Sequence, residues 1–374
     1  MIESINIVSF DVPFPANYGG VIDVFYKIKT FHSKGVKVHL HCFEYGRGEQ
    51  PELEKYCESV TYYKRKISWI NTMGKLPFIV KTRISNELKN NLLKNNYPIL
   101  FEGLHTCYLL KDKDLKERIK IYRESNIEHE YYRHLANSER SFLKKIYLRK
   151  EANKLEEFEK IVKYATHTFL VSKTDYHYFE SKYPNNSNHF IPSFHSGEEV
   201  KVEQGKGNFV LYQGNLSVSE NYDAVMYLIR NVFSVLETPF VIAGLNPPDF
   251  LELEINKYPH ISLIKNPSDT KMKELIKTAQ INLLYTNQAT GLKLKLLNVL
   301  YNGRFCIVNS KMVVGTTLDS ICEVEDDISK TIVLIKELMV LEFPKSELEI
   351  RKKVLQENYS NAINFDRIGK VLNS

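Results

Sequence analysis

The residue pattern best suited to chemistry lies in the second half of the chain, where a glycine loop precedes two lysines. An apolar run over 281–285 leads to Gly291, and Lys293 and Lys295 then fall in the first turn of an expected helix. A helix N-terminus disfavours cations, so something must compensate these lysines. A bound diphosphate would do so, because the lysines would neutralise it while backbone amides cradle it. The alternative is that both side chains extend into solvent.

A second glycine loop, Asn17–Gly20, stands near the N-terminus between an expected strand and an expected helix. Gly19 and Gly20 would let backbone N–H groups approach an anion at a helix N-terminus. The loop is not the G-x-G-x-x-G fingerprint, so no nicotinamide cofactor is indicated. The alternative is a tight turn that needs glycine for its backbone alone.

Three further residues carry groups that can hold or move a proton. His105 follows one expected strand, and Glu128 with His129 follows another. An imidazole both donates and accepts near neutral pH, which suits a position facing a substrate hydroxyl or a reacting oxygen. The alternatives are a structural histidine at position 105 and a helix cap at 128–129.

Neither a metal site nor covalent catalysis is indicated. Asp112 and Asp114 have the D-x-D spacing used for divalent cations, but lysines flank and neutralise them. The five cysteines are far apart and form no Cys-x-x-Cys, so neither a disulfide framework nor a zinc site is expected. No Ser/His/Asp or Cys/His order stands out. We therefore expect chemistry that requires no metal and no cofactor.

The elements that must position these residues alternate between strands and helices. Residues 5–10 form a β-branched run, 21–33 have apolar residues at helical spacing, and 36–43 form a second strand. This βαβ unit implies a parallel sheet with helices on its faces. Further strands of this half are expected at 98–102, 119–123, 168–172 and 189–192, and one long charged helix over 139–164.

A polar stretch with three glycines, residues 195–208, is the expected linker between two domains. After it the pattern restarts, with strands expected at 209–213, 240–243, 261–264, 281–285 and 306–309, and helices at 222–233 and 271–278. Both halves are therefore predicted to be doubly wound, Rossmann-like α/β domains. Such sheets bind ligands at the carboxyl ends of their strands, which places the expected site in a cleft between the two domains.

Composition excludes several classes of protein. The 374 residues are 43% hydrophobic and 26% charged, which argues against disorder and against a fibrous repeat. No run approaches the roughly 18 apolar residues of a membrane span. The N-terminus has neither a basic segment nor a long apolar segment of a secretory signal. We therefore expect a cytoplasmic, reduced protein.

The charge is concentrated in the first half of the chain. The whole chain carries 51 basic and 45 acidic residues, and residues 1–195 carry 31 against 23. The basic run 64–66 lies between tyrosines and Trp69. Basic residues beside aromatics suit an anionic surface, such as membrane headgroups, a lipid pyrophosphate or nucleic acid. No nucleic-acid signature accompanies the charge, so nucleic acid is not expected. The alternative is a solvated loop.

The segment around Gly291 resembles the donor-site motif of GT-B glycosyltransferases, the large retaining group (group 1 type) that includes many bacterial capsule and lipopolysaccharide enzymes. There a glycine loop leads into a helix with an E-x7-E pattern, followed by a glycine and a strand. Gly291, Lys295 and Gly303 fit this order. Thr290 and Asn298 stand where the two glutamates would be, and Asn298 can still hydrogen-bond a ribose hydroxyl.

Other segments resemble the same family in the same order. Gly315, Thr316 and Thr317 are similar to its second phosphate loop, and residues 210–221 to the loop that opens its C-terminal domain. Asn215 and Glu220 replace the Arg and Lys of that loop. The family pattern is also followed by residues 13–20, 101–105, 123–132 and 240–244, and by the chain's final stretch.

The resemblance implies a domain plan and a set of site residues. Residues 1–195 would bind the acceptor, 206–355 the nucleotide-sugar donor, and 356–374 would form a helix crossing back to the first domain. The donor-binding residues implied are Gly19, Gly20, Gly214, Asn215, Gly291, Lys293, Lys295, Asn298, Gly315, Thr316 and Thr317. The catalytic residues implied are His105, Lys295, Glu128 and His129.

The activity implied is that of a retaining hexosyltransferase without a metal. It would move a sugar from a nucleotide-diphosphate sugar to a hydroxyl of a saccharide carried on a lipid, in surface polysaccharide synthesis at the inner face of the plasma membrane. Two alternatives stay open. One is a GT-B sugar-nucleotide epimerase, which needs no acceptor, and the other is a catalytically degenerate partner subunit.

Overall fold

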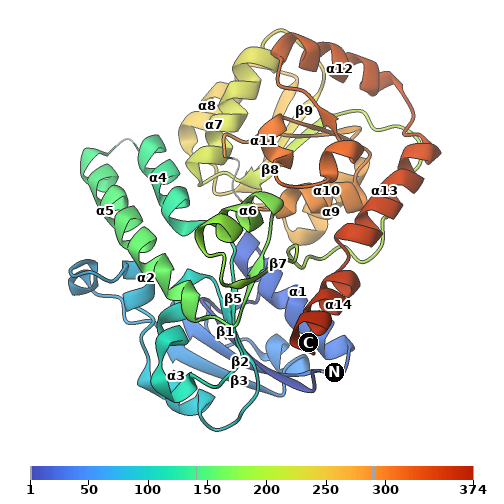
Figure 1. Ribbon diagram of the computed structural model, residues 1–374. Helices are drawn as coiled ribbons and strands as arrows, with labels where there is room; N and C mark the ends of the chain where they lie inside the picture. Colours follow the sequence, from blue (N-terminus) through green and yellow to red (C-terminus); the bar gives the residue numbers. More distant parts are fainter. Residues whose placement is uncertain (1, 140, 289–290, 374) are drawn as a thin grey trace. The chain divides into compact units, whose positions relative to one another are not determined.

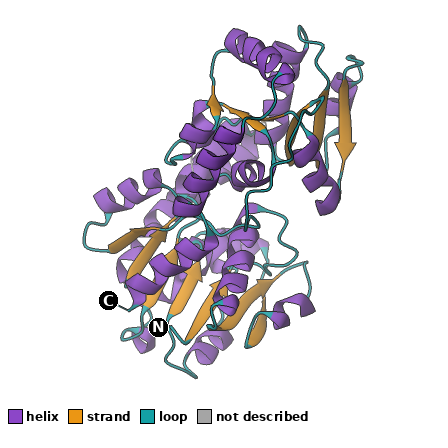
Figure 2. Cartoon of the chain, turned by 90° about the vertical axis from the view of Figure 1, so that its right-hand side faces the viewer, coloured by secondary structure: helices purple, strands orange, loops and turns teal. Residues whose placement is uncertain are grey.

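The structure is a computed structural model that describes residues 2–139, 141–288 and 291–373, and it divides into two compact units. The first unit holds the chain up to Ser196, together with Gly291, Leu292 and the segment that starts at Asn361. The second unit holds the remainder, from Gly197 to Ser360. Each is a parallel sheet covered by helices (Figures 1 and 2).

The first unit is built on seven parallel strands in the order β3-β2-β1-β4-β5-β6-β7. The strands are β1 Ser4–Ser9, β2 Lys37–Glu44, β3 Ser59–Lys64, β4 Ile99–Glu102, β5 Lys120–Arg123, β6 His167–Leu170 and β7 Ser187–Phe190. The α-helices are α1 Gly19–Ser33, α2 Phe78–Lys81, α3 Asn86–Leu92, α4 Glu128–Ser138, α5 Phe142–Glu159, α6 Lys173–Lys182 and α14 Asn361–Leu372. The order reverses between β1 and β4, which makes their carboxyl ends the switch point of the sheet.

The second unit is built on six parallel strands in the order β10-β9-β8-β11-β12-β13. The strands are β8 Val210–Asn215, β9 Phe240–Leu245, β10 Ile261–Lys265, β11 Ile281–Leu284, β12 Phe305–Val308 and β13 Glu323–Val324. The α-helices are α7 Ser219–Leu228, α8 Asp249–Ile255, α9 Asp269–Thr278, α10 Leu294–Asn302, α11 Ser310–Val313, α12 Ile328–Val340 and α13 Lys345–Asn358. Here the switch point lies between β8 and β11.

Alternation along the central strands builds a core on each face of the first sheet. Val8 and Phe101 face one hydrophobic cluster, whereas their neighbours Ile7 and Leu100 face the other. Strand residues point alternately to opposite faces, so a strand covered on both sides must be apolar throughout. That requirement explains why the short β-branched runs could be assigned to strands from the sequence, and the predicted α/β class with two Rossmann-like domains is correct.

Two helices and a strand illustrate where the structure differs from the sequence-based expectation. The helix expected over 139–164 is shorter, because the chain is extended at Glu139 and Ser141 and the last turn, 160–164, is a 3-10 helix. The helix expected at 222–233 begins at Ser219 and ends in a π-helical turn over 229–233. Strand β3 was not expected, since it is an edge strand in which only Tyr63 is buried and no clear alternation appears.

A buried charge cluster fixes α1 against the strands of the first sheet. Lys27 Nζ lies 2.6 Å from Glu102 Oε1 and 3.1 Å from Asp23 Oδ2, and Arg123 Nε donates to Asp23 Oδ2 at 3.0 Å. Burial opposes ionisation of Asp23, yet Arg123 and Lys27 outweigh it and lower the pKa of Asp23 to about 2. Because breaking a buried pair leaves an uncompensated charge, this cluster holds the start of α1 in a defined place beside β4 and β5.

The last helix, α14, packs on α1 in the first unit. The Phe365 and Phe31 rings meet edge to face with centroids 5.3 Å apart. Asn361 exchanges hydrogen bonds with the backbone of His195, accepting at 3.1 Å and donating at 2.8 Å. The chain therefore leaves the first unit near residue 196 and returns to it at residue 361.

Candidate functional site

The Lys295 side chain lies among polar groups near the carboxyl ends of β8 and β11. It lies in the first turn of α10, whose N-cap residue, Lys293, provides no side-chain cap. Its Nζ donates to Asn221 Oδ1 at 3.1 Å and lies 5.3 Å from the centroid of the Tyr212 ring. Burial lowers the pKa of Lys295 to about 8; Glu220 raises it and Lys293 lowers it further. A phosphate placed here would restore full protonation.

Asn221 organises the polar surroundings of Lys295, and sequence reasoning missed this residue. Besides accepting from Lys295, it donates from Nδ2 to the Asn215 carbonyl at 2.9 Å. A Cβ on Gly214 would lie 3.2 Å from the Asn221 amide, so the loop after β8 needs a glycine or a shift of that amide. Asn215 Oδ1 accepts from the backbone N and the hydroxyl of Ser217, which folds the loop over the strand end. The sequence feature that could have identified Asn221 is its position directly after Glu220, in the loop that resembles the family pattern.

The loops that follow β11 and β12 are tied to each other. Thr286 N donates to Asn309 Oδ1 at 3.1 Å, and Asn309 Nδ2 returns a bond to Thr286 O at 2.8 Å. The Thr286 hydroxyl also donates to Glu220 Oε1, which joins α7 to the end of β11. The start of α7 and the ends of β11 and β12 are therefore held together at one edge of the sheet.

The expected second phosphate loop is held mainly by its own hydrogen bonds. Gly315 has φ +72°, a conformation that favours glycine. Thr316 Oγ1 donates to Val313 O at 2.7 Å and accepts from Leu318 N. The Thr317 backbone N donates to the Tyr359 hydroxyl at 2.9 Å. These two threonines shape the loop, and their contact with a donor stays a prediction.

The remaining predicted donor residues lie around the start of α10. Asn298 accepts from Asn302 Nδ2 at 3.1 Å, so its amide oxygen is engaged within the helix. Gly291 has φ +66°, and a Cβ there would lie 2.8 Å from Asn126 Oδ1. Thr290 lies outside the described residues.

In the first unit the predicted residues gather at the carboxyl ends of β1, β4 and β5. A Cβ on Gly20 would lie 2.4 Å from the Phe10 ring, whereas a Cβ on Gly19 would meet nothing within 4 Å. Phe10 stacks on His105 with centroids 5.1 Å apart. Arg83, which is buried, donates from Nε to Phe10 O at 2.8 Å. Phe10 and Arg83 are thus positioning residues that sequence reasoning missed.

His105 and Glu128 face each other in this group, with His105 Nδ1 3.9 Å from Glu128 Oε1. Burial, with Arg83 and Arg65, holds the pKa of His105 well below its usual range. Burial raises the pKa of Glu128 to about 8, with Arg83 opposing. At neutral pH both groups are therefore uncharged. At 3.9 Å the two are not hydrogen bonded to each other, and His105 Nδ1 is buried without a hydrogen-bond partner. They offer uncharged hydrogen-bonding groups to a polar ligand rather than a strong base.

His129 points away from this group. Its Nδ1 lies 3.2 Å from Glu159 Oε2, and Glu159 is also reached by Lys182 and by the hydroxyls of Tyr178 and Tyr183. His129 therefore helps pack α4 against α5 and α6, while Glu128, one residue earlier, faces His105. Its predicted catalytic role has no support in this geometry.

Within the described ranges, no three His, Cys, Asp or Glu side chains are grouped so as to hold a metal ion. Asp112 and Asp114, the D-x-D of the sequence, both pair with Lys89, at 2.9 and 2.6 Å. Helices long and apolar enough to cross a bilayer are likewise missing from the described part of the chain.

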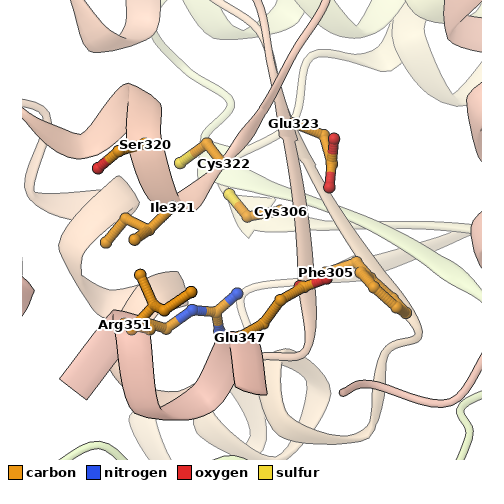
Figure 3. A pocket seen from close by; sticks show the side chains of 9 residues that line it. Phe305, Cys306, Ser320, Ile321, Cys322, Glu323, Glu347 and Arg351 are labelled. Atoms are coloured by element: carbon orange, nitrogen blue, oxygen red, sulfur yellow. The ribbon is translucent and has the colours of Figure 1, made fainter. Parts of the chain in front are cut away.

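A cavity of about 310 Å³ lies in the second unit, away from the strand ends just described (Figure 3). Phe305, Cys306, Cys322 and Glu323 line it, at the amino ends of β12 and β13, whereas the Lys295 seat is at the carboxyl edge. The neighbouring Cys306 thiol and burial raise the pKa of Cys322 well above its usual range. A protonated thiol is a poor nucleophile.

Comparison with solved structures places the fold in a known class. The lipopolysaccharide outer core galactosyltransferase WaaB matches with a TM-score of 0.64 and 12% identity over 99% of both chains. HepE of Anabaena, in complex with UDP and glucose, matches with 0.67 and 7%, also over 99% of both. A UDP-forming α,α-trehalose-phosphate synthase of Burkholderia vietnamiensis matches with 0.59 and 9%, over 99% of this chain and 100% of the synthase. The chain has the GT-B fold of these glycosyltransferases.

A relative is also found by sequence comparison. It is an uncharacterized 44.6 kDa protein in the cps region of Klebsiella pneumoniae, 29% identical over 330 residues, which cover 83% of this chain and 84% of the relative. No protein-family model matches the chain.

Proposed function

We propose that this chain is a retaining glycosyltransferase that uses a nucleoside diphosphate sugar and needs no metal. The observation that supports it best is the seat of Lys295, a partly desolvated ammonium at the start of a helix, beside the switch point of a GT-B sheet. A departing diphosphate develops negative charge, and a lysine with backbone amides aimed at that charge stabilises it. Lys293 and the amides following Gly291 complete this donor site.

The donor most worth testing carries uridine. Two of the structural neighbours are described with UDP, as a bound ligand or as a product. Tyr285, at the end of β11, stacks on Tyr227 with centroids 5.0 Å apart, which offers an aromatic platform near the strand ends. We therefore place the nucleotide in the second unit and the sugar acceptor in the first.

The proposed acceptor is a saccharide hydroxyl, carried on a lipid and used in surface polysaccharide synthesis on the inner face of the plasma membrane. The cps-region relative supports the polysaccharide context. In the first unit, the uncharged His105 and Glu128 would bind acceptor or donor hydroxyls, and Arg83 and Phe10 would position them. Front-face attack, the mechanism that the family resemblance implies for retention, needs no strong protein base, and this pair supplies none at neutral pH.

The test is a thermal-shift panel of UDP, GDP, ADP, CMP and their sugar conjugates. A ligand that binds only the folded chain adds about 2.7 kcal/mol of stability at a hundredfold excess over its Kd. We expect a clear shift with one diphosphate. A flat panel would reject the transferase and favour a degenerate partner subunit.

A second arm of the test separates transfer from epimerisation. The diphosphate that binds is offered as its sugar conjugate, with and without a saccharide acceptor, and the released nucleotide is measured. We expect release to depend on the acceptor, and the anomer of the product read by NMR to match that of the donor. Conversion of a UDP-N-acetylhexosamine without an acceptor would instead establish an epimerase.

A further inference from the structure

The flank of the first unit carries exposed apolar side chains from two segments distant in sequence. We call them the apolar strip: Ile67, Trp69, Ile70 and Met73 from the 66–74 loop, with Phe142, Leu143, Ile146 and Tyr147 from α5. Their exposure is large, reaching 73% for Trp69, 73% for Phe142 and 77% for Leu143. Exposed apolar groups gathered on one side usually mark a surface that binds something.

The first half of α5 leaves these four side chains exposed, although the helix also packs against α4. Residues 142–150 include no buried side chain, whereas the second half of the helix buries Ala152 and Leu155. Phe142 and Ile146 are four residues apart, as are Leu143 and Tyr147, so the four share one side of the helix. The amino-terminal half of α5 is thus an amphipathic arm rather than a core helix.

The same side of α5 leads directly to the 66–74 loop. Lys154, three turns beyond Phe142, donates from Nζ to Thr72 O at 2.7 Å, and Glu151 accepts from Phe78 N at 2.6 Å. At 1.5 Å per residue, Phe142 and Lys154 are about 18 Å apart along the helix. Figure 1 shows α5 and α2 along the same flank of this unit. The two apolar segments therefore lie on the same flank of the first unit.

The strip is surrounded by positive charge. Residues 64–81 include five Lys or Arg and no Asp or Glu, and residues 141–150 include four Lys or Arg and no Asp or Glu. Burial and Glu151 raise the pKa of Tyr147, and the Arg65 guanidinium opposes them, so Arg65 of the first segment lies close to α5. The charge thus comes from both segments of the strip.

We propose that this strip docks the chain on an anionic phospholipid bilayer. Aliphatic side chains and Phe142 would enter the acyl boundary, Trp69 would lie at the headgroups, and the lysines would neutralise lipid phosphates. A second copy of the chain is a poorer occupant, because a symmetric contact would oppose two basic surfaces. Nucleic acid phosphates would pair with the lysines, but the aliphatic side chains would stay exposed to water. The proposal adds a binding surface to the proposed function and does not depend on donor or acceptor binding.

The experiment is flotation of the full chain with vesicles of phosphatidylcholine, alone or with 30% phosphatidylglycerol, with no nucleotide present. We expect binding to the anionic vesicles that weakens with salt. The double variant Phe142→Ser/Leu143→Ser should lower the partition coefficient about tenfold, and so should the triple variant Lys144→Gln/Lys145→Gln/Lys150→Gln.

Matched controls come from the second unit. Leu253 and Val340 are 69% and 66% exposed, so Leu253→Ser/Val340→Ser removes as many exposed apolar groups and should float like the parent chain. Lys330→Gln/Lys336→Gln/Lys352→Gln removes the same number of charges there. Trp69 fluorescence should shift to the blue on vesicles, and since this is the only tryptophan of the chain, the shift reports on the strip itself.

Three results would overturn the proposal. One is no flotation on anionic vesicles. Another is equal loss of flotation in the control variants. The third is a concentration-dependent dimer, seen by light scattering, that the Phe142→Ser/Leu143→Ser variant abolishes, because the strip would then bind a second copy. Nucleotide thermal shifts on the same variants keep this outcome separate from the proposed transferase, since a chain that binds diphosphate but no vesicle contradicts only the docking surface.

Discussion

At the scale of single residues, two titratable groups have ionisation states that their neighbours set. Lys295 loses part of its hydration to the Tyr212 ring and the Asn221 amide, and its pKa falls to about 8. Glu128 is buried near His105, and its pKa rises to about 8. Both pKa values therefore lie near neutral pH. Strongly shifted pKa values of this kind are concentrated at functional sites.

Replacing Lys295 with methionine should stabilise the empty chain and weaken diphosphate binding. The pKa of Lys295 in the folded chain lies below its unfolded value of about 10.4, so its charge costs stability below pH 8 and the cost fades as pH rises toward 10.4. After a discount for partial exposure we expect a Tm increase of roughly 2–4 °C at pH 7. Diphosphate affinity, measured by calorimetry, should fall about 10- to 100-fold.

Lys336→Met serves as the control, because this lysine is exposed in the second half of α12. This control variant should change neither the Tm nor the diphosphate affinity. A Lys295→Met chain that binds UDP with parent affinity would remove Lys295 from the donor site and leave only its effect on stability.

Replacing Glu128 with glutamine should flatten the dependence of stability on pH. The pKa of Glu128 lies near 8 in the folded chain and near 4.3 in the unfolded one, so the folded state binds more protons between these values and stability falls as pH rises through them. Glutamine mimics the protonated carboxyl. Between pH 5 and pH 8 the variant should therefore lose less stability than the parent, by at least about 1.4 kcal/mol.

The measurement is urea unfolding at both pH values. Glu130→Gln, two residues along α4, provides the comparison at a less buried carboxylate. Identical pH slopes in the parent and Glu128→Gln chains would show that Glu128 is already ionised at neutral pH, and the neutral His105–Glu128 pair would be wrong.

At the scale of elements, each site depends on a loop between a strand end and a helix start. In the first unit the loop after β1 brings Gly20 against the Phe10 ring, and the same ring stacks on His105. In the second unit the loop after β8 is closed by Asn221 and the loops after β11 and β12 by Asn309. These contacts place the starts of the helices, and hence their backbone amides, beside the switch points of the sheets.

The two adjacent glycines of the first loop should respond differently to alanine. A Cβ on Gly20 would stand 2.4 Å from Phe10, so Gly20→Ala should cost about 1–3 kcal/mol as the ring is displaced. A Cβ on Gly19 would meet nothing, so Gly19→Ala should be neutral or slightly stabilising. Equilibrium unfolding measures both.

Phe10→Leu combined with Gly20→Ala should recover part of the loss, because the smaller side chain leaves room for the methyl group. If Gly19→Ala and Gly20→Ala change the free energy of unfolding equally, contact with the Phe10 ring is not what disfavours a side chain at position 20.

At the scale of the whole molecule, the second unit is inserted into the first. The chain leaves the first unit after Ser196 and returns at Asn361, where α14 packs on α1. Each unit has its own sheet and its own core clusters. A ligand bound by one unit should therefore stabilise mainly that unit.

Hydrogen exchange with and without UDP should locate the donor. We expect the strongest protection in residues 210–221 and 294–317, and none in the edge strands β3 and β7. If Gly19 and Gly20 also bind the diphosphate, the first amides of α1 will be protected as well. Protection confined to the first unit would contradict the assignment of donor binding to the second.

The sequence by itself determined the α/β class, most strands, the two glycine loops and the order of the motifs. These features are local, because β-branched runs, helical spacing and glycine positions act over a few neighbouring residues. The resemblance to glycosyltransferases could be inferred from the order of these motifs, and solved structures with that fold match the chain at 7–12% identity.

Only the tertiary structure decided which of the candidate residues share a site and how they ionise. Lys295 meets Asn221 across 74 positions of sequence, and Glu128 turns toward His105 while its neighbour His129 turns to Glu159. Phe10 and Arg83 became visible only through their packing, since neither type nor spacing marks them. Burial and charge at a site are sums over neighbours from several strands, and no short stretch of sequence contains that sum.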